Sequence, residues 1–263
     1  MPLEALIFDV DGTLAETEEL HRRAFNETFE AFGLDWVWTP DLYRILLRVT
    51  GGKERIRYYV EGWCPHGGEK ALAQVAEIHA SKTASYSTFV EAGLAEPRPG
   101  ILQLIDEAHS EGIALAIATT TALGNVTALL RTSFGAERAF WFSAIAAGDM
   151  VEQKKPAPDI YNVVLEQLGL QASVCIAFED SENGVAAARD VGLAVIATPS
   201  FYTKDDDFCR ATSVISDLGE AKRSFRHIAG RRIGAGRIDI GSLRGILEEN
   251  QSLSHLARDY EIF

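Results

Sequence analysis

Two aspartates separated by a single residue lie near the start of the chain, directly after a short apolar run. Asp9 and Asp11 follow residues 3–8, and Gly12 and Thr13 come next. Because alternate side chains of an extended chain point to the same side, the two carboxylates should lie together at the end of a strand. Their repulsion costs about 1–4 kcal/mol at about 4 Å. A chain accepts that cost for a bound cation or for acid–base chemistry, although a surface turn is an equally good interpretation of this pattern alone.

Three further groups of polar residues occur at comparable places. They are Thr119–Thr121 after the apolar run 113–118, Lys154 and Lys155 before a proline, and Glu179 and Asp180 after the apolar run 174–178. Threonine hydroxyls can hold phosphoryl oxygens, a lysine supplies positive charge, and adjacent acids suit Mg²⁺. Each group alone also fits a turn, a solvated surface pair or a helix cap. Together, at successive strand or loop ends, the four groups predict one phosphate-binding site with a metal.

The elements that must bring these groups together are short apolar strands that alternate with helices. Strands are expected at residues 3–8, 113–118, 174–178, 194–198 and 214–215, with a further short strand inside 140–147, and helices at 101–111, 125–134, 159–168 and 184–191. Continuous apolar strands separated by helices are typical of a parallel sheet that is covered on both faces. Ligands of such a sheet bind beyond the carboxyl ends of its strands, which is where the polar groups occur.

Residues 16–96 have a different pattern, with helical periodicity and no alternation typical of strands. Helices are expected around residues 24–32, 40–48, 53–61 and 68–90, and the proline-containing residues 96–100 form a stiff connector. We therefore expect a core domain of residues 1–15 and 97–263, interrupted by a helical domain of residues 16–96. The basic residues 222–236 are expected to form an exposed loop, and residues 238–250 a final strand or short helix.

Composition and charge narrow the class of protein. The 263 residues are 47% hydrophobic and 24% charged, which is ordinary for a soluble globular protein. A formal net charge of −13 argues against binding to nucleic acids or to anionic membranes. The three scattered cysteines suit neither a disulfide framework nor a zinc site, and no apolar stretch reaches the length of a membrane helix. A reducing, cytoplasmic setting is therefore expected. We also expect a monomer whose partner is a small-molecule substrate.

The four polar groups resemble the motifs of the haloacid dehalogenase-like hydrolases, and the resemblance covers residues 1 to about 220. That family uses an Asp-x-Asp pair, a threonine after the second main strand, a lysine and a final acidic pair. The inserted helices resemble the small cap of its β-phosphoglucomutase branch. Residues 9–26, 50–56 and 117–121 are similar to CbbY proteins, which are encoded with enzymes of the Calvin cycle. The resemblance implies a Rossmann-like α/β core with an inserted α-helical cap domain.

The resemblance also implies a Mg²⁺-dependent phosphatase that hydrolyses a sugar phosphate, with xylulose 1,5-bisphosphate as substrate and xylulose 5-phosphate as product. Asp9 would be the nucleophile and would form an aspartyl-phosphate, and Asp11 would act as general acid and then as general base. Mg²⁺ would be held by Asp9, by the backbone carbonyl of Asp11 and by Asp180, with Glu179 bound directly or through a neighbouring group.

The remaining site residues that the resemblance implies bind the substrate. Thr119 and Lys155 would bind the phosphoryl oxygens. The residues that would contact other parts of the substrate are Glu16, Thr17, Glu18 and His21 past the first motif, Gly52, Lys53 and Arg55 in the cap, and Thr120 and Thr121 beside Thr119. Either Lys53 or Arg55 would hold a second, distal phosphate.

Three alternatives use similar residues. A β-phosphoglucomutase has the same site but returns the phosphoryl group to a sugar, and a phosphoglycolate phosphatase acts on a smaller substrate. A receiver domain of the response-regulator type also places acids, a threonine and a lysine at strand ends. It has no helical insert, however, and its phosphate acceptor does not lie on the first strand.

Overall fold

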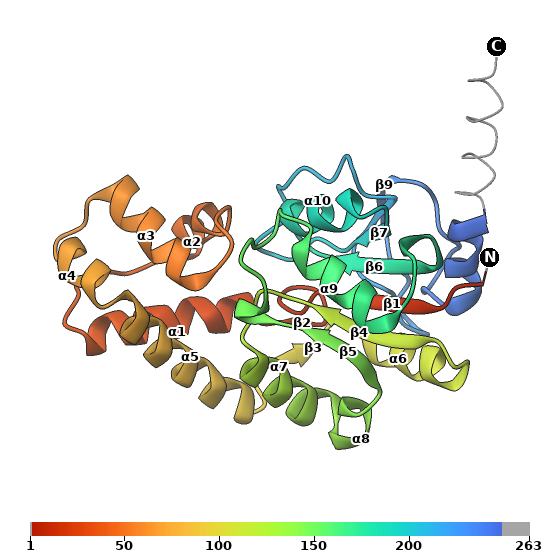
Figure 1. The fold of residues 1–263 in the computed structure, drawn as a ribbon, viewed down its shortest axis with the longest axis horizontal. Helices are drawn as coiled ribbons and strands as arrows, with labels where there is room; N and C mark the ends of the chain where they lie inside the picture. The colour runs from red at the N-terminus through yellow and green to blue at the C-terminus, as the bar shows by residue number, and fades with distance from the viewer. Residues whose placement is uncertain (1, 249–263) are drawn as a thin grey trace, which may run out of the picture.

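A single main sheet organises the larger part of the molecule (Figure 1). The computed structural model describes residues 2–248. The strand order is β5-β4-β1-β6-β7-β8-β9, in which β9 runs antiparallel to β8 and all other neighbours are parallel. The strands are β1 (Ala5–Phe8), β4 (Ala114–Ala118), β5 (Phe142–Ala146), β6 (Cys175–Glu179), β7 (Ala194–Ala197), β8 (Ser213–Ile215) and β9 (His227–Gly230). The expected parallel sheet is confirmed.

Helices cover both faces of this sheet. They are α6 (Ile101–Ser110), α7 (Leu123–Leu129), α8 (Ala136–Ala139), α9 (Asp159–Leu168) and α10 (Glu182–Asp190), and residues 240–248 are also helical. Leu6 and Phe8 of β1 pack in one apolar cluster with α6 and α7, whereas Ala5 and Ile7 pack in a second cluster with α9 and α10. The division follows from the strand itself, since successive side chains point to opposite faces.

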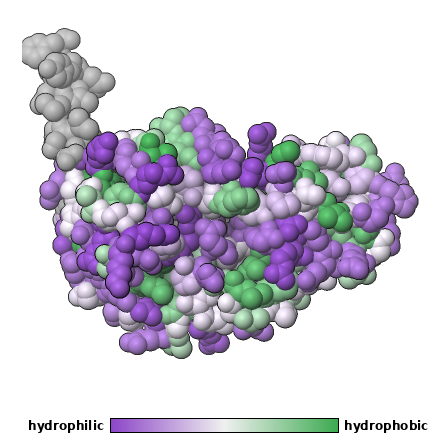
Figure 2. Space-filling model, turned by 180° about the vertical axis from the view of Figure 1, so that it is seen from behind, coloured by the Kyte–Doolittle hydropathy of each residue, from purple (hydrophilic) through white to green (hydrophobic). Residues whose placement is uncertain are grey.

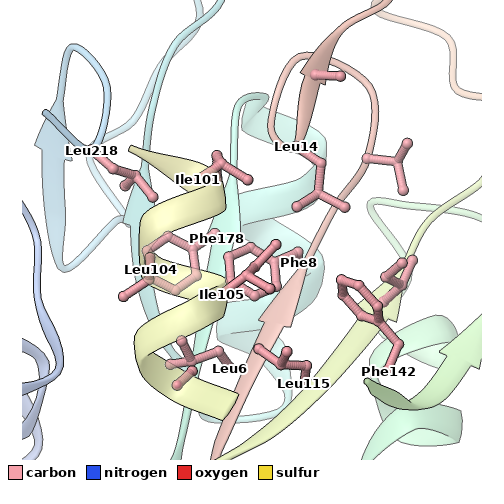
Figure 3. Close-up of a cluster of buried hydrophobic side chains, with 14 of the residues drawn as sticks. Leu6, Phe8, Leu14, Ile101, Leu104, Ile105, Leu115, Phe142, Phe178 and Leu218 are labelled. Atoms are coloured by element: carbon pink, nitrogen blue, oxygen red, sulfur yellow. The ribbon is translucent and has the colours of Figure 1, made fainter. Parts of the chain in front are cut away.

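The first of these clusters fixes the strand that carries the two aspartates. The rings of Phe8 and Phe178 stack with their centroids 4.8 Å apart, and both side chains are fully buried. Figure 3 shows Leu104 and Ile105 of α6 lying over these two rings. Strands β1 and β6 are therefore held in register immediately before Asp9, Glu179 and the residues that follow.

The helical insert lies to one side of the sheet (Figure 1). It consists of α1 (Glu18–Ala31), α2 (Pro40–Leu46), α3 (Gly52–Trp63), α4 (Gly68–Ala73) and α5 (Val75–Glu91). Its apolar cluster is rich in aromatic residues, including Phe25, Trp38 and Tyr43, and it also takes in Tyr202 from the core. The chain enters and leaves the insert through a small antiparallel pair, β2 (Ala15–Glu16) and β3 (Glu96–Pro97). The domain division at residues 16 and 96 stays a prediction.

Several expected elements differ from the observed ones. The expected helix 68–90 is two helices, because Gln74 leaves the helical conformation between α4 and α5. The expected helix 125–134 ends in a π-helical turn, Leu130–Phe134. The basic segment 222–236 is not all loop, since it contributes the edge strand β9. The region 238–250 is helical over residues 240–248, and its last two residues lie outside the described part of the chain.

The surface has the mixed polarity of a solvated protein. Figure 2 shows hydrophilic residues over most of one face, with small apolar patches between them. Within residues 2–248, no helix combines the length and the apolar character that crossing a membrane requires.

Candidate active site

The carboxyl ends of three neighbouring strands bring the predicted polar groups together. Phe8 at the end of β1 is in register with Ile117 of β4 and with Phe178 of β6. The residues that follow each strand must therefore meet at one edge of the sheet. The turn after Asp11 is possible because Gly12 adopts a left-handed conformation with φ +81°, which residues with a side chain rarely adopt.

Lys155 joins the first acidic motif to the last. Its ammonium nitrogen lies 2.6 Å from Asp9 Oδ1 and 2.6 Å from Glu179 Oε1, and all three side chains are buried. Burial would lower the pKa of Lys155, but the two carboxylates outweigh it and raise that pKa. Burial raises the pKa of Asp9 to about 7 against the opposing charge of Lys155. Tyr161 donates a second hydrogen bond to Glu179 Oε1.

Three buried carboxylates form a group that suits a divalent cation. Oxygen atoms of Asp9, Glu179 and Asp180 all lie within 4.8 Å of one another. Burial raises the pKa of Asp180 well above its usual range, and the charges of Asp9 and Glu179 raise it further. Among the described residues, the buried Glu179 Oε2 has no hydrogen-bond partner. One lysine cannot balance three carboxylates, so the donor set fits Mg²⁺, a cation that prefers oxygen ligands.

Asp11 is held by a separate set of hydrogen bonds. Its carboxylate accepts from the hydroxyl of Thr17 at 2.6 Å, from the hydroxyl of Thr121, and from His21 Nε2 at 2.9 Å. Burial alone would raise the pKa of Asp11, but His21 and the two hydroxyls outweigh it and hold that pKa well below its usual range. Asp11 is therefore ionised in this arrangement.

A buried lysine supports His21 from the other side. Lys82 Nζ lies 2.5 Å from His21 Nδ1, and the imidazole stacks on Tyr86 with ring centroids 3.8 Å apart. Burial lowers the pKa of both side chains, to about 7 for Lys82. A neutral His21 that accepts at Nδ1 and donates from Nε2 satisfies both contacts, so the network assigns the tautomer.

Two cavities lie between the sheet edge and the helical insert. The larger, of about 360 Å³, is lined by Asp9, Lys155 and Asp180 and also by Arg44, Arg48 and Arg55 from the insert. The smaller, of about 100 Å³, is lined by His21, Gly52 and Lys82, among others. Asp11, Glu18, Arg55 and Thr120 line both cavities.

The predicted substrate residues are not all at these cavities. Thr119 is buried, and its hydroxyl accepts from the backbone N–H of Thr121 at 3.2 Å. Lys53 is among the lining residues of neither cavity, although its neighbour Arg55 lines both. Glu16 also lines neither, because it lies in the hinge strand β2 and pairs with Arg98 at 3.2 Å. The contact of Glu16 and Lys53 with substrate therefore has no support in this arrangement.

Sequence reasoning missed several residues of the larger cavity. Arg44 lies in α2 and Arg48 in the turn that follows it, but the region was predicted only as a helix. Asn183 donates from Nδ2 to the Arg48 carbonyl and to the Thr50 hydroxyl, both at 3.1 Å, and so links core to insert. The sequence around Lys82 does not indicate a buried lysine, because only the packing of α5 on α1 buries this side chain.

The sequence matches the haloacid dehalogenase-like hydrolase family over residues 3–192. The chain belongs to that family. It is 52% identical to the protein CbbY of Rhodobacter capsulatus over 221 residues, which are 84% of this chain and 96% of that relative. The family membership makes the chain a hydrolase, and within the family it groups with the CbbY proteins.

Solved structures agree with this grouping. A crystal structure of CbbY from Rhodobacter sphaeroides in complex with phosphate is similar, with a TM-score of 0.77 and 49% identity, and the match covers 82% of this chain and 94% of that one. A mutant of the same protein in complex with xylulose-(1,5)bisphosphate gives a TM-score of 0.76 at 46% identity, covering 84% and 98% of the two chains.

Proposed function

We propose that this hydrolase is a Mg²⁺-dependent sugar phosphatase that converts xylulose 1,5-bisphosphate to xylulose 5-phosphate. The observation that carries the proposal is the lining of the larger cavity. The core lines it with the carboxylates and the lysine expected for phosphoryl transfer, and the insert lines it with three arginines. Such a cavity suits a substrate with one phosphate at each end. The related CbbY structure with xylulose-(1,5)bisphosphate supports the same substrate.

Asp9 is the proposed nucleophile. Lys155 holds Asp9 Oδ1 at 2.6 Å, which leaves the other carboxylate oxygen to attack phosphorus and form an aspartyl-phosphate. Lys155 lines the larger cavity and would bind the transferred phosphoryl oxygens. Thr119 lines neither cavity, so its contact with the phosphoryl group rests on the family resemblance alone. Asp9, Glu179 and Asp180, with the Asp11 backbone carbonyl, would hold Mg²⁺, which offsets the repulsion between these carboxylates and the phosphate dianion.

Asp11 is the proposed acid and base. Its ionised state in the free enzyme suits the second half of the reaction, in which a base removes a proton from the water that attacks the aspartyl-phosphate. In the first half it must carry a proton to the leaving sugar oxygen. A phosphate dianion beside Asp11 raises the pKa of that carboxyl, so the proton would be taken up as the substrate enters.

Arg55 is the proposed ligand of the distal phosphate. It lines both cavities, whereas Lys53 lines neither, and its guanidinium can bind a phosphate through two hydrogen bonds. The Nε–H groups of Arg44 and Arg55 are buried donors without an acceptor among residues 2–248. Buried donors without acceptors are costly unless a ligand satisfies them, which supports an anion beside these arginines.

A screen of phosphate release tests the proposal. Ketose and aldose mono- and bisphosphates are supplied with Mg²⁺, and released phosphate and sugar products are both measured. We expect the highest kcat/KM for xylulose 1,5-bisphosphate, with xylulose 5-phosphate as product. Formation of glucose 6-phosphate from β-glucose 1-phosphate without net phosphate release would favour the mutase instead. Preference for phosphoglycolate would favour a phosphoglycolate phosphatase.

A further inference from the structure

We propose that Tyr43 is a positioning residue that sets the preference for a bisphosphate, by holding Arg55 and Glu18 in place at the substrate cavities. This inference rests on the proposed function, because it concerns the subsite for the distal phosphate. Tyr43 itself is fully buried and is absent from the lining of both cavities. It therefore acts through the two charged side chains and not by contact with substrate.

One hydroxyl connects two opposite charges. The Tyr43 hydroxyl donates to Glu18 Oε2 at 2.9 Å and accepts from Arg55 Nη1 at 2.9 Å. Both Glu18 and Arg55 line the two cavities, so each has one side toward Tyr43 and one toward the substrate. Burial raises the pKa of Tyr43 well above its usual range, so the hydroxyl keeps the proton that it donates to Glu18.

The ring of Tyr43 cannot shift easily. The guanidinium carbon of Arg55 lies 5.2 Å from its centroid, as in a cation–π contact. The ring also packs against Trp38 at 6.0 Å and meets Tyr202 edge-on at 5.5 Å and 88°. Tyr202 belongs to the core and donates its hydroxyl to Glu19 of the insert. Tyr43 is thus fixed from both parts of the molecule, which makes it a rigid support for Arg55.

The hydroxyl also keeps Arg55 available for an anion. Without it, the guanidinium and the Glu18 carboxylate are opposite charges in the same cavity wall and can turn toward each other. A direct pair between them would neutralise the charge that the distal phosphate needs. A cation fixed in advance costs less ordering free energy on binding than one that must be withdrawn from another partner.

The variant Tyr43→Phe tests this role, because it keeps the aromatic ring and removes only the hydroxyl. We expect the KM for xylulose 1,5-bisphosphate to rise about tenfold, which corresponds to a loss of about 1.4 kcal/mol of binding free energy. The kcat should stay within about threefold, and the KM for xylulose 1-phosphate should change less than about twofold. Tyr59→Phe is the matched control, since Tyr59 lies in the same aromatic cluster and lines neither cavity.

A second measurement separates positioning from general damage. If the hydroxyl acts through Arg55, Tyr43→Phe should add less than about twofold to the KM of a protein that already carries Arg55→Ala. Equal changes in KM for the bisphosphate and the monophosphate, or the same kinetics for the Tyr43 and Tyr59 variants, would overturn this inference but leave the proposed function standing. Failure of the wild-type protein to release phosphate from the bisphosphate would overturn the proposed function and this inference together.

Discussion

At the scale of single residues, specific neighbours hold the catalytic candidates: Lys155 contacts Asp9 and Glu179, and His21 contacts Asp11. Asp9, Asp11 and Lys155 could be predicted because each stands in a local pattern of known chemical use. Lys82 and Arg44 could not, because their burial or orientation depends on helix packing that no short stretch of sequence specifies. Glu16 and Lys53 were also expected at the substrate, but neither lines the two cavities, and Glu16 pairs with Arg98.

The distal arginine gives one prediction at this scale. Arg55→Ala should raise the KM for xylulose 1,5-bisphosphate by about 10- to 100-fold, since a hydrogen bond to a charged group contributes about 1.5–3 kcal/mol. The KM for a xylulose monophosphate should rise much less. Lys53→Ala is the matched control, because it removes a neighbouring positive charge that does not line the cavities. Steady-state kinetics on both substrates measure the difference, and an equal loss on both would exclude a role at the distal phosphate.

Lys82 gives a second prediction, in the pH dependence of stability. Its pKa is about 7 in the folded protein, below the usual 10.5 of the unfolded chain. Between these values the unfolded chain binds a proton that the folded protein lacks, so rising pH stabilises the fold. Below about pH 7 both states are charged, and the folded state carries the full cost of the buried ammonium. Lys82→Met should therefore be more stable than wild type near pH 6, with a smaller advantage near pH 10.

Urea unfolding of the two proteins across this pH range measures that difference. Titrating groups away from Lys82 largely cancel in the comparison. His21 does not, because Lys82 lowers its pKa, so the variation between pH 8 and pH 10, above the range in which His21 titrates, isolates the effect of Lys82. A stability difference between Lys82→Met and wild type that does not vary with pH would show that Lys82 keeps its ordinary pKa in the folded protein.

At the scale of elements, the register of β1, β4 and β6 assembles the site. Three apolar runs in the sequence predicted these strands, and the carboxyl ends of parallel strands meet at one edge of the sheet. Where the periodicity is strong, as in α9, both ends of the helix could be predicted from the sequence. The break at Gln74 could not, because the residues around it continue the helical composition. Strand β9 was missed because an exposed edge strand in a basic, glycine-containing segment lacks the apolar alternation that identifies a strand.

A core substitution tests the importance of this register. Phe8→Ala should lower the free energy of unfolding by about 3–5 kcal/mol, because it removes a fully buried ring that stacks on Phe178. Phe140→Ala, at a side chain that is 83% exposed, should change it by less than about 0.5 kcal/mol. Urea denaturation provides both values, and similar effects for the two variants would contradict the packing described.

At the scale of the whole molecule, a chain with a net charge of −13 is proposed to bind a doubly anionic substrate. The larger cavity places three arginines and Lys155 among several carboxylates, so a divalent cation at Asp9, Glu179 and Asp180 would supply the positive charge that a bisphosphate still needs. The insert and the core both contribute residues to the lining of that cavity. Relative movement of the two parts would therefore assemble or open the site, as in enzymes whose caps close over substrate.

Removal of the divalent cation should affect both activity and stability. Phosphate release should stop with excess chelator and return with Mg²⁺. The melting temperature should also rise with Mg²⁺, because a ligand at about 100 times its Kd stabilises the folded state by about 2.7 kcal/mol. Asp180→Asn should lose most of that thermal shift. A shift of equal size in this variant would place the cation elsewhere.

The central claim is that Asp9 attacks the substrate phosphate, and phosphate release by Asp9→Asn measures it most directly. Wild type and variant are compared on xylulose 1,5-bisphosphate with Mg²⁺, and circular dichroism verifies that both are folded. The account predicts release of one phosphate per substrate by the wild type and a loss of at least about 1,000-fold in the variant, since an amide cannot form the aspartyl-phosphate. Activity of Asp9→Asn within tenfold of wild type would contradict it.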